Sequence, residues 1–152
     1  MKSTFFCTKL GKKELKLKIK EFAKSQQVNR VICSKKATFI KGSYSPHTNT
    51  IFLCSALTKK TMLCTFFHEL SHHIASKQEE WLNYHFDLEL YSTDKIFLLE
   101  NKIDKIAKQL WNEHVNILTW GKYQYSYPVR DKQVLLSWIK QHMKTKNANI
   151  QQ

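Results

Sequence analysis

Hydrophobic residues recur every three to four positions in three stretches of the chain, a pattern that predicts helices buried along one face. The first stretch covers residues 13–27 and alternates its apolar positions with lysines. The second begins near Thr58, which can cap the helix, as can Ser55, and its apolar surface is broad enough for the helix to be largely buried. The third follows Ser92, covers residues 94–111 and has the clearest amphipathic pattern in the chain.

Three short runs rich in β-branched and aromatic residues predict strands between the first two helices, over residues 28–33, 37–44 and 50–54. Turn-forming residues connect the last two runs as a hairpin. We therefore expect an α+β fold, with a small antiparallel sheet packed on helices, in a single domain that spans residues 1–152. The remaining expected elements are a polar helix over 78–90, an extended segment over 123–128 and a last helix over 134–139.

The composition is that of a globular protein, because 42% of the residues are hydrophobic and 12% are aromatic. No apolar run approaches the length of a membrane span, and the N-terminus lacks the features of a signal peptide. The four cysteines are scattered without Cys-x-x-Cys spacing, which argues against a zinc ribbon or a disulfide framework and suits a reducing compartment. We expect a cytoplasmic protein that does not engage a membrane, with Cys64 as a small buried residue.

The chain is strongly basic, with 25 Lys and Arg against 12 Asp and Glu and a net charge of +13. Such a charge predicts attraction to acidic partners, such as nucleic acid, a DNA-bound protein or an anionic surface. The lysines are spread along the chain, with one group over residues 12–20 and another over 140–146. Solvated faces explain many such groups, so direct nucleic-acid binding is an alternative that the charge allows and does not establish.

The candidate chemistry lies in the second helix, in the sequence His68-Glu69-Leu70-Ser71-His72. Positions i and i+4 share one face of a helix, so His68 and His72 can hold one metal ion from adjacent turns. Glu69 would then stand beside the metal, placed to take a proton from a bound water. This pattern is typical of zinc-dependent peptidases. The alternative is a surface helix that carries two histidines and no metal.

A catalytic zinc site needs a third protein ligand and an open position for water. Gln78 stands six residues after His72, where a histidine would indicate the metzincin arrangement, so that arrangement is excluded. Glu100, 28 residues after His72, lies on the third helix, and Asp104 follows one turn later on the same face. The first carboxylate can bind the metal while the second accepts a hydrogen bond from the far nitrogen of a ligand histidine. Alternatively, both point outward beside neighbouring lysines.

His85, 13 residues after His72, is a competing third ligand. Its spacing resembles that of SprT-like DNA–protein crosslink proteases, although Phe86 stands where those proteins usually have glycine. His73 cannot join the site, because the neighbour of a ligand points about 100° away around the helix.

The chain resembles the ImmA/IrrE family of intracellular metallopeptidases over roughly residues 37–111. The resemblance consists of the strand 50–54, the helix around His68 to His72, and Glu100-x-x-Ile103-Asp104-x-Ile106-Ala107-x-x-Leu110. The family usually has alanine and phenylalanine at the two isoleucine positions and leucine at Trp111. The resemblance implies His68, His72 and Glu100 as zinc ligands, Glu69 as the catalytic base and a DNA-bound transcriptional repressor as the protein substrate.

The sequence thus predicts a zinc endopeptidase in which Glu69 serves as general base and then passes the proton to the leaving amine. An oxyanion donor is expected among four candidates, namely Tyr123, Tyr125, Tyr127 and His114. The substrate would lie extended along the strand 50–54. Two interpretations of other classes stay open: a non-catalytic, zinc-containing protein that binds DNA or a DNA-bound regulator, and a helical protein without metal.

Overall fold

The computed structural model describes residues 4–35, 41–78 and 92–125, and over these ranges the fold is α+β. The helices are α1 (Lys12–Ser25), α2 (Lys59–Ser76), α4 (Thr93–His114) and α5 (Ile117–Trp120), and the strands are β1 (Arg30–Ser34), β2 (Gly42–Ser45) and β3 (Thr50–Cys54). The three amphipathic helices and the β2–β3 hairpin are confirmed. The first four residues of the predicted second strand and the helices expected at 78–90 and 134–139 fall outside the described residues, apart from Gln78.

Side chains near the chain start of each long helix satisfy backbone N–H groups that have no partner within the helix. The Thr58 hydroxyl accepts from the N–H of Thr61 at 3.4 Å, which makes Thr58 the cap of α2. Ser92 caps α4 in the same way, through the N–H of Lys95 at 3.2 Å. These contacts are local in sequence, and for that reason both caps were predictable from residue type alone.

The sheet is mixed, and the expectation of an antiparallel sheet is wrong for one of its two strand pairs. The strand order is β1-β3-β2, with β2 antiparallel and β1 parallel to β3. The cause is the way the chain enters β1. The Asn29 N–H donates to the carbonyl of Asn49 at 2.9 Å, and the Asn49 side-chain amide donates to the carbonyl of Gln27 at 2.8 Å. The starts of β1 and β3 are therefore tied together, so the two strands run in the same direction.

The central position of β3 also corrects the expected substrate path. Both backbone edges of β3 are hydrogen-bonded, one to β1 and the other to β2. A peptide therefore cannot add to the strand 50–54 as a further strand, because strand addition requires a free edge.

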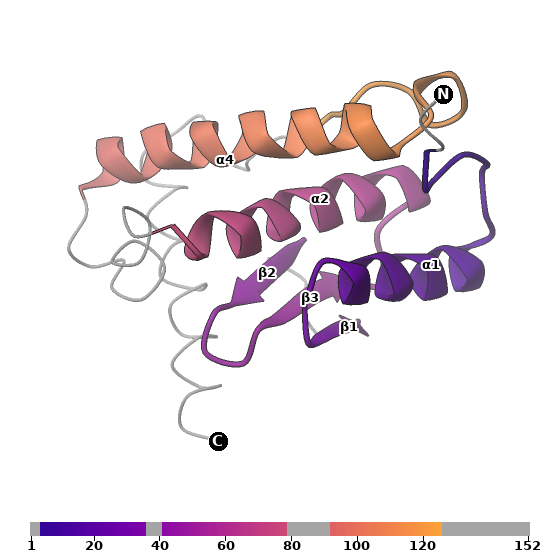
Figure 1. The fold of residues 1–152 in the computed structure, drawn as a ribbon, viewed down its shortest axis with the longest axis horizontal. Coiled ribbons are helices and arrows are strands. Elements are labelled where there is room, and N and C mark those ends of the chain that lie inside the picture. The colour runs from indigo at the N-terminus through magenta and orange to yellow at the C-terminus, as the bar shows by residue number, and fades with distance from the viewer. Residues whose placement is uncertain (1–3, 36–40, 79–91, 126–152) are drawn as a thin grey trace.

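Helices α1 and α2 pack against the sheet, and α4 packs against α2 on the side away from the sheet (Figure 1). The hydrophobic core lies between these layers and includes Ile19 of α1, Ile51 of β3, Phe67 of α2 and Trp111 of α4. A glycine is required where β2 meets α2. A Cβ at Gly42 would lie 2.7 Å from Cγ2 of Thr65 and 2.8 Å from the carbonyl oxygen of Phe52. The absence of a side chain at Gly42 therefore allows α2 to approach the sheet this closely.

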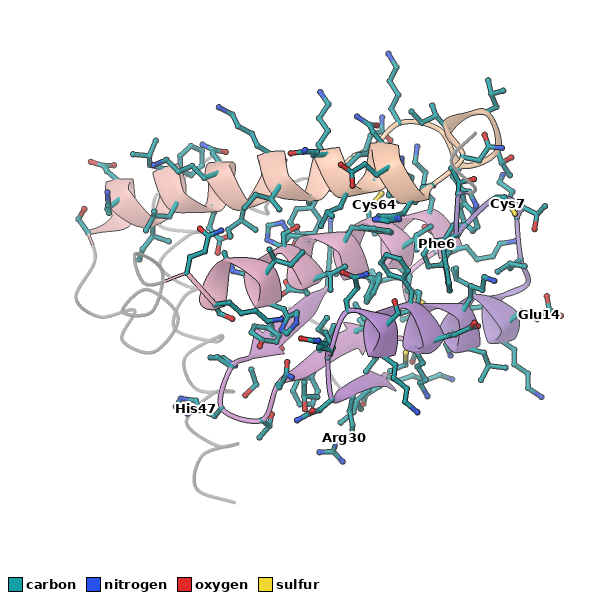
Figure 2. All side chains as sticks on the ribbon, in the orientation of Figure 1. Phe6, Cys7, Glu14, Arg30, His47 and Cys64 are labelled. Carbon is teal, nitrogen blue, oxygen red and sulfur yellow. The ribbon has the colours of Figure 1, made fainter. Side chains whose placement is uncertain are left out.

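The N-terminal segment fixes the far end of α4. Phe6 donates its N–H to the carbonyl of His114 at 2.9 Å and accepts from the N–H of Asn116 at 3.0 Å. Its ring is buried and meets Phe67 of α2 edge to face, with ring centroids 5.8 Å apart (Figure 2). The contacts set the position of α4 relative to α2, and the candidate site lies between these two helices.

None of the helices in residues 4–35, 41–78 and 92–125 combines the length and the apolar composition that crossing a membrane requires.

Candidate metal centre

The two histidines of the motif lie side by side on the buried face of α2. His68 is 1% exposed and His72 is 8% exposed, and their ring centroids are 5.0 Å apart. The spacing of four residues places them on adjacent turns, and the apolar residues around them bury that face against α4 and the sheet.

Glu100 comes from α4 and meets both histidines. Its Oε2 lies 3.1 Å from Nε2 of His72 and 3.4 Å from Nε2 of His68, and the side chain is buried. One ligand atom from each of the three residues lies within 4.8 Å of the others. The structure therefore brings together the three residues that the sequence nominated as ligands, from two helices that are separated along the chain.

The spacing of these donors fits a tetrahedral metal ion. Ligand atoms about 2.0–2.2 Å from a tetrahedral zinc ion lie about 3.3–3.6 Å from one another, close to the distances of 3.1 and 3.4 Å from Glu100 to His72 and His68. Two imidazoles and one carboxylate also form a donor set that zinc commonly takes. Glu69 and Glu100 are only 2% and 4% exposed. Because buried carboxylates are costly without compensating charge, a divalent cation at this position would stabilise both.

The electrostatic environment of the cluster favours positive charge. Burial by itself lowers the pKa of His68, but the neighbouring carboxylates of Asp104, Glu100 and Glu69 outweigh it and raise the pKa to about 9. Burial tends to raise the pKa of Glu100, whereas His72 and His68 hold it well below its usual range. The negative potential that raises the proton affinity of His68 acts in the same direction on a metal cation.

Asp104 stands one turn after Glu100 and approaches the other side of the His68 ring. Its Oδ1 lies 3.7 Å from Nδ1 of His68 and accepts a hydrogen bond of 2.6 Å from the hydroxyl of Tyr123. The far nitrogen of His68 thus faces a carboxylate that is itself held in place. Such contacts orient a ligand histidine and increase its basicity.

Glu69 follows His68 on α2 and is buried within the same region. Its charge acts on both neighbours at the site, because it contributes to the raised pKa of His68 and to that of Tyr125. Its carboxylate is not one of the three converging donor atoms, which come from His68, His72 and Glu100.

Residues 121–125, which we call the return segment, bring a second tyrosine onto the cluster. The Tyr125 ring stacks on the His68 imidazole, with centroids 4.1 Å apart and planes inclined by 13°. Burial, followed by the charges of Glu69, Glu100 and Asp104, raises the pKa of Tyr125 well above its usual value, so its hydroxyl keeps its proton. The sequence nominated Tyr125 only as one of four candidates, because no local pattern shows which tyrosine returns to α2.

Side-chain hydrogen bonds fix the return segment on both sides. The Trp111 indole N–H donates to the carbonyl of Gly121 at 3.0 Å, and Lys60 donates to the side-chain oxygen of Gln124 at 3.3 Å. Tyr123 is held by Asp104 as described above. The segment therefore spans from α4 to α2 beside the cluster.

The other described histidines lie away from the cluster. His73 donates from Nε2 to the carbonyl of Gln26 at 2.9 Å, and its Nδ1 lies 3.1 Å from the Tyr44 hydroxyl, which confirms that it points away from the site. His114 packs edge to face on Phe22 at 4.9 Å, and His47 projects from the β2–β3 turn (Figure 2). Cys64 is buried, as expected, and burial raises the pKa of its thiol. His85 and Tyr127 lie outside the described residues.

The residues of α2 and α4 thus form a buried centre of two histidines and one glutamate that could hold a metal ion. Comparison of the chain with protein-family models, with curated proteins and with solved structures finds no match.

Proposed function

We propose that this protein is a zinc-dependent endopeptidase with a zincin-like core. The observation that carries the proposal is the convergence of His68, His72 and Glu100 on one point, with a buried glutamate directly after the first histidine. Three protein ligands leave a position open for water or substrate, which distinguishes a catalytic zinc site from a closed structural one.

His68, His72 and Glu100 would hold the ion, and Asp104 would orient His68. When bound, zinc would act as a Lewis acid on the peptide carbonyl and lower the pKa of water towards neutrality. Glu69 would take the proton from the attacking water and deliver it to the nitrogen of the leaving amine. These assignments agree with the ligands and base that the ImmA/IrrE resemblance implies.

The resemblance also supports a protein substrate, and a DNA-bound transcriptional repressor in the cytoplasm is the one we propose. The basic charge of the chain supports a partner of this kind, because an acidic or DNA-associated target would be attracted over a distance.

Tyr125 is the oxyanion donor that the geometry favours among the described candidates. The Tyr123 hydroxyl donates a hydrogen bond to Asp104, and His114 packs on Phe22. The Tyr125 ring, in contrast, stacks directly on the imidazole of His68, one of the proposed ligands. A hydroxyl beside the reacting carbonyl would stabilise the charge that develops on its oxygen.

Replacement of Tyr125 by phenylalanine should lower kcat for peptide hydrolysis by about 10²-fold, the usual effect of removing one oxyanion donor. Zinc affinity should change little, because the stacked ring is retained. Tyr123→Phe is the matched control: it should lower zinc affinity instead, through the loss of the hydrogen bond to Asp104. Competition with a chelator measures the zinc affinity of each variant, and hydrolysis rates at saturating zinc measure kcat. If Tyr125→Phe left kcat unchanged, its hydroxyl would have no part in hydrolysis and Tyr125 would serve only to pack His68.

Metal analysis tests the proposal most directly. Protein purified without chelator should contain one zinc ion per chain, as measured by inductively coupled plasma mass spectrometry. Removal of this zinc should lower the melting temperature of the protein. The expected destabilisation is about 2.7 kcal/mol when free zinc exceeds Kd by 100-fold, because the metal binds only the folded state. Metal-free protein with an unchanged melting temperature in the presence of added zinc would contradict the proposal and favour a helical protein without metal.

A further inference from the structure

Four lysines lie along α1 at intervals of four residues: Lys12, Lys16, Lys20 and Lys24. With a rise of about 1.5 Å per residue, neighbours in this row stand about 6 Å apart along the axis and the row extends for about 18 Å. Lys20 and Lys24 are exposed, and Lys12 and Lys16 are half-buried. We call these four residues the lysine row.

The lysine row continues into β1, which packs beside α1. Burial raises the pKa of the Cys33 thiol in β1, and the charges of Lys20 and Lys16 act on the same thiol in the opposite direction, so the row lies close to this strand. Arg30 at the start of β1 is exposed and projects away from the helices (Figure 2), and Lys35 after its end is exposed as well. Residues 4–35 carry nine Lys and Arg against two Glu.

The lysine row is separate from the residues of α1 that are buried in the core. The core face of α1 consists of Leu15, Ile19, Phe22 and Ala23. Like charges at i and i+4 destabilise a helix, and none of the four lysines is among the ion pairs with carboxylates found in residues 4–35, 41–78 and 92–125. Glu14 is occupied in the cap of α1, where it accepts the N–H of Gly11 at 3.1 Å. The four lysines therefore repel one another in the folded protein, and a bound anion would reduce this repulsion.

The residue types on this face distinguish between three kinds of acidic partner: a membrane surface, a protein and a nucleic acid. A helix that enters a membrane surface needs a free apolar face, but the apolar face of α1 is already in the core. Protein interfaces are enriched in aromatic residues and depleted in lysine, and Leu17 is the only exposed large hydrophobic residue that α1 contributes in the described chain. A regular line of ammonium groups without apolar anchors fits a phosphate backbone.

We propose that α1 and β1 bind the phosphate backbone of a nucleic acid through the lysine row and Arg30. This surface lies on the sheet side of α2, whereas α4, which supplies Glu100, lies on the other side (Figure 1). Binding would therefore not require metal at the His-His-Glu centre, and the inference stands whether or not the protein is a peptidase. Contacts to phosphates alone would make binding tolerant of base sequence.

The test measures fluorescence anisotropy of a short labelled DNA duplex, with duplex and single-stranded RNA as parallel probes, between about 50 and 200 mM NaCl. The full chain is used, both zinc-loaded and chelator-treated. The variant is Lys20→Gln with Lys24→Gln, both on exposed positions of α1. The matched control is Lys95→Gln with Lys108→Gln, which removes the same charge from exposed positions of α4. Circular dichroism checks that all variants fold.

The wild type should bind with an affinity that falls steeply as salt increases, equally with and without zinc. The α1 variant should reduce the slope of log K against log[salt] by about 2, because each lost phosphate contact contributes about 0.9 on duplex DNA. The α4 control should leave the slope unchanged. A preference for either RNA probe would support the surface and identify RNA as its partner.

Three outcomes would overturn the proposal. The first is the absence of binding to every probe at the lowest salt, and the second is an equal loss in the α4 control, which would show that only net charge matters. The third is binding to anionic phosphatidylserine vesicles that depends on Lys20 and Lys24 while the nucleic-acid probes fail to bind, which would make the face a membrane surface.

Discussion

Replacement of Glu69 by glutamine is expected to abolish peptide hydrolysis while one zinc ion stays bound per chain. Glutamine keeps the size and the polar atoms of the buried side chain but cannot accept the proton of the attacking water. General base catalysis accounts for about 10²–10⁴-fold in rate, so cleavage should fall below detection in most assays. Glu69 is not among the three converging donor atoms, and for that reason metal content should be preserved.

The measurement uses a library of peptides prepared from a cell lysate, with new N-termini identified by mass spectrometry after incubation with the zinc-loaded protein. Glu69→Gln is the matched control for contaminating peptidases, since it retains the fold and the metal. Cleavage by the wild type that the variant reproduces at the same rate would refute the role of Glu69. Zinc-loaded wild type that cleaves neither peptides nor intact partner proteins would favour the non-catalytic interpretation, in which zinc is structural.

Removal of Glu100 has the second large expected effect. Glu100→Ala should lower zinc affinity by more than about 100-fold, because substitutions of residues that merely support a ligand already cost about 10–100-fold. His72→Ala should do the same and also destabilise the fold, since it leaves the buried Glu100 without its closest imidazole, at 3.1 Å. Competition with a chromogenic chelator measures the affinity, and thermal unfolding with and without zinc measures the linked stability.

The same assay decides between the two candidate third ligands. His85→Ala should leave zinc affinity unchanged, because His68, His72 and Glu100 already offer three donor atoms within 4.8 Å of one another. The reverse result, in which His85→Ala releases zinc and Glu100→Ala retains it, would replace the ImmA/IrrE-type arrangement with that of the SprT-like proteases. Asp104→Asn should have an effect on zinc affinity between these two, because Asp104 approaches the far nitrogen of His68 at 3.7 Å and is not one of the three converging donors.

Local features of the fold were accessible from the sequence because neighbouring residues determine them. The period of apolar residues predicted α1, α2 and α4, and the hydroxyl side chains at Thr58 and Ser92 identified where two of these helices start. The strand at 50–54 agrees with β3 at both ends. Such features depend on side chains within a few residues of one another, whose relative positions are fixed once the helix or strand is formed.

The pairing of the strands, in contrast, could not be predicted from the sequence. The parallel pairing of β1 with β3 depends on hydrogen bonds that join residues 27–29 to Asn49. Gln27 and Asn49 also adopt positive φ angles of 67° and 51°. The residue types alone do not predict this backbone conformation. An alternating run of apolar residues predicts a strand but contains no information about which neighbour it pairs with or in which direction.

The helical repeat places His68 and His72 on one face of a helix and Glu100 and Asp104 on one face of another, so both relations follow from residue spacing. Residue spacing does not show that these two faces meet, with the Glu100 carboxylate between the imidazoles, or that Tyr125 stacks on His68. These contacts depend on the packing of the core, which joins α2, α4 and the return segment without any periodicity along the chain. A metal centre built from separate helices exists only when that packing does.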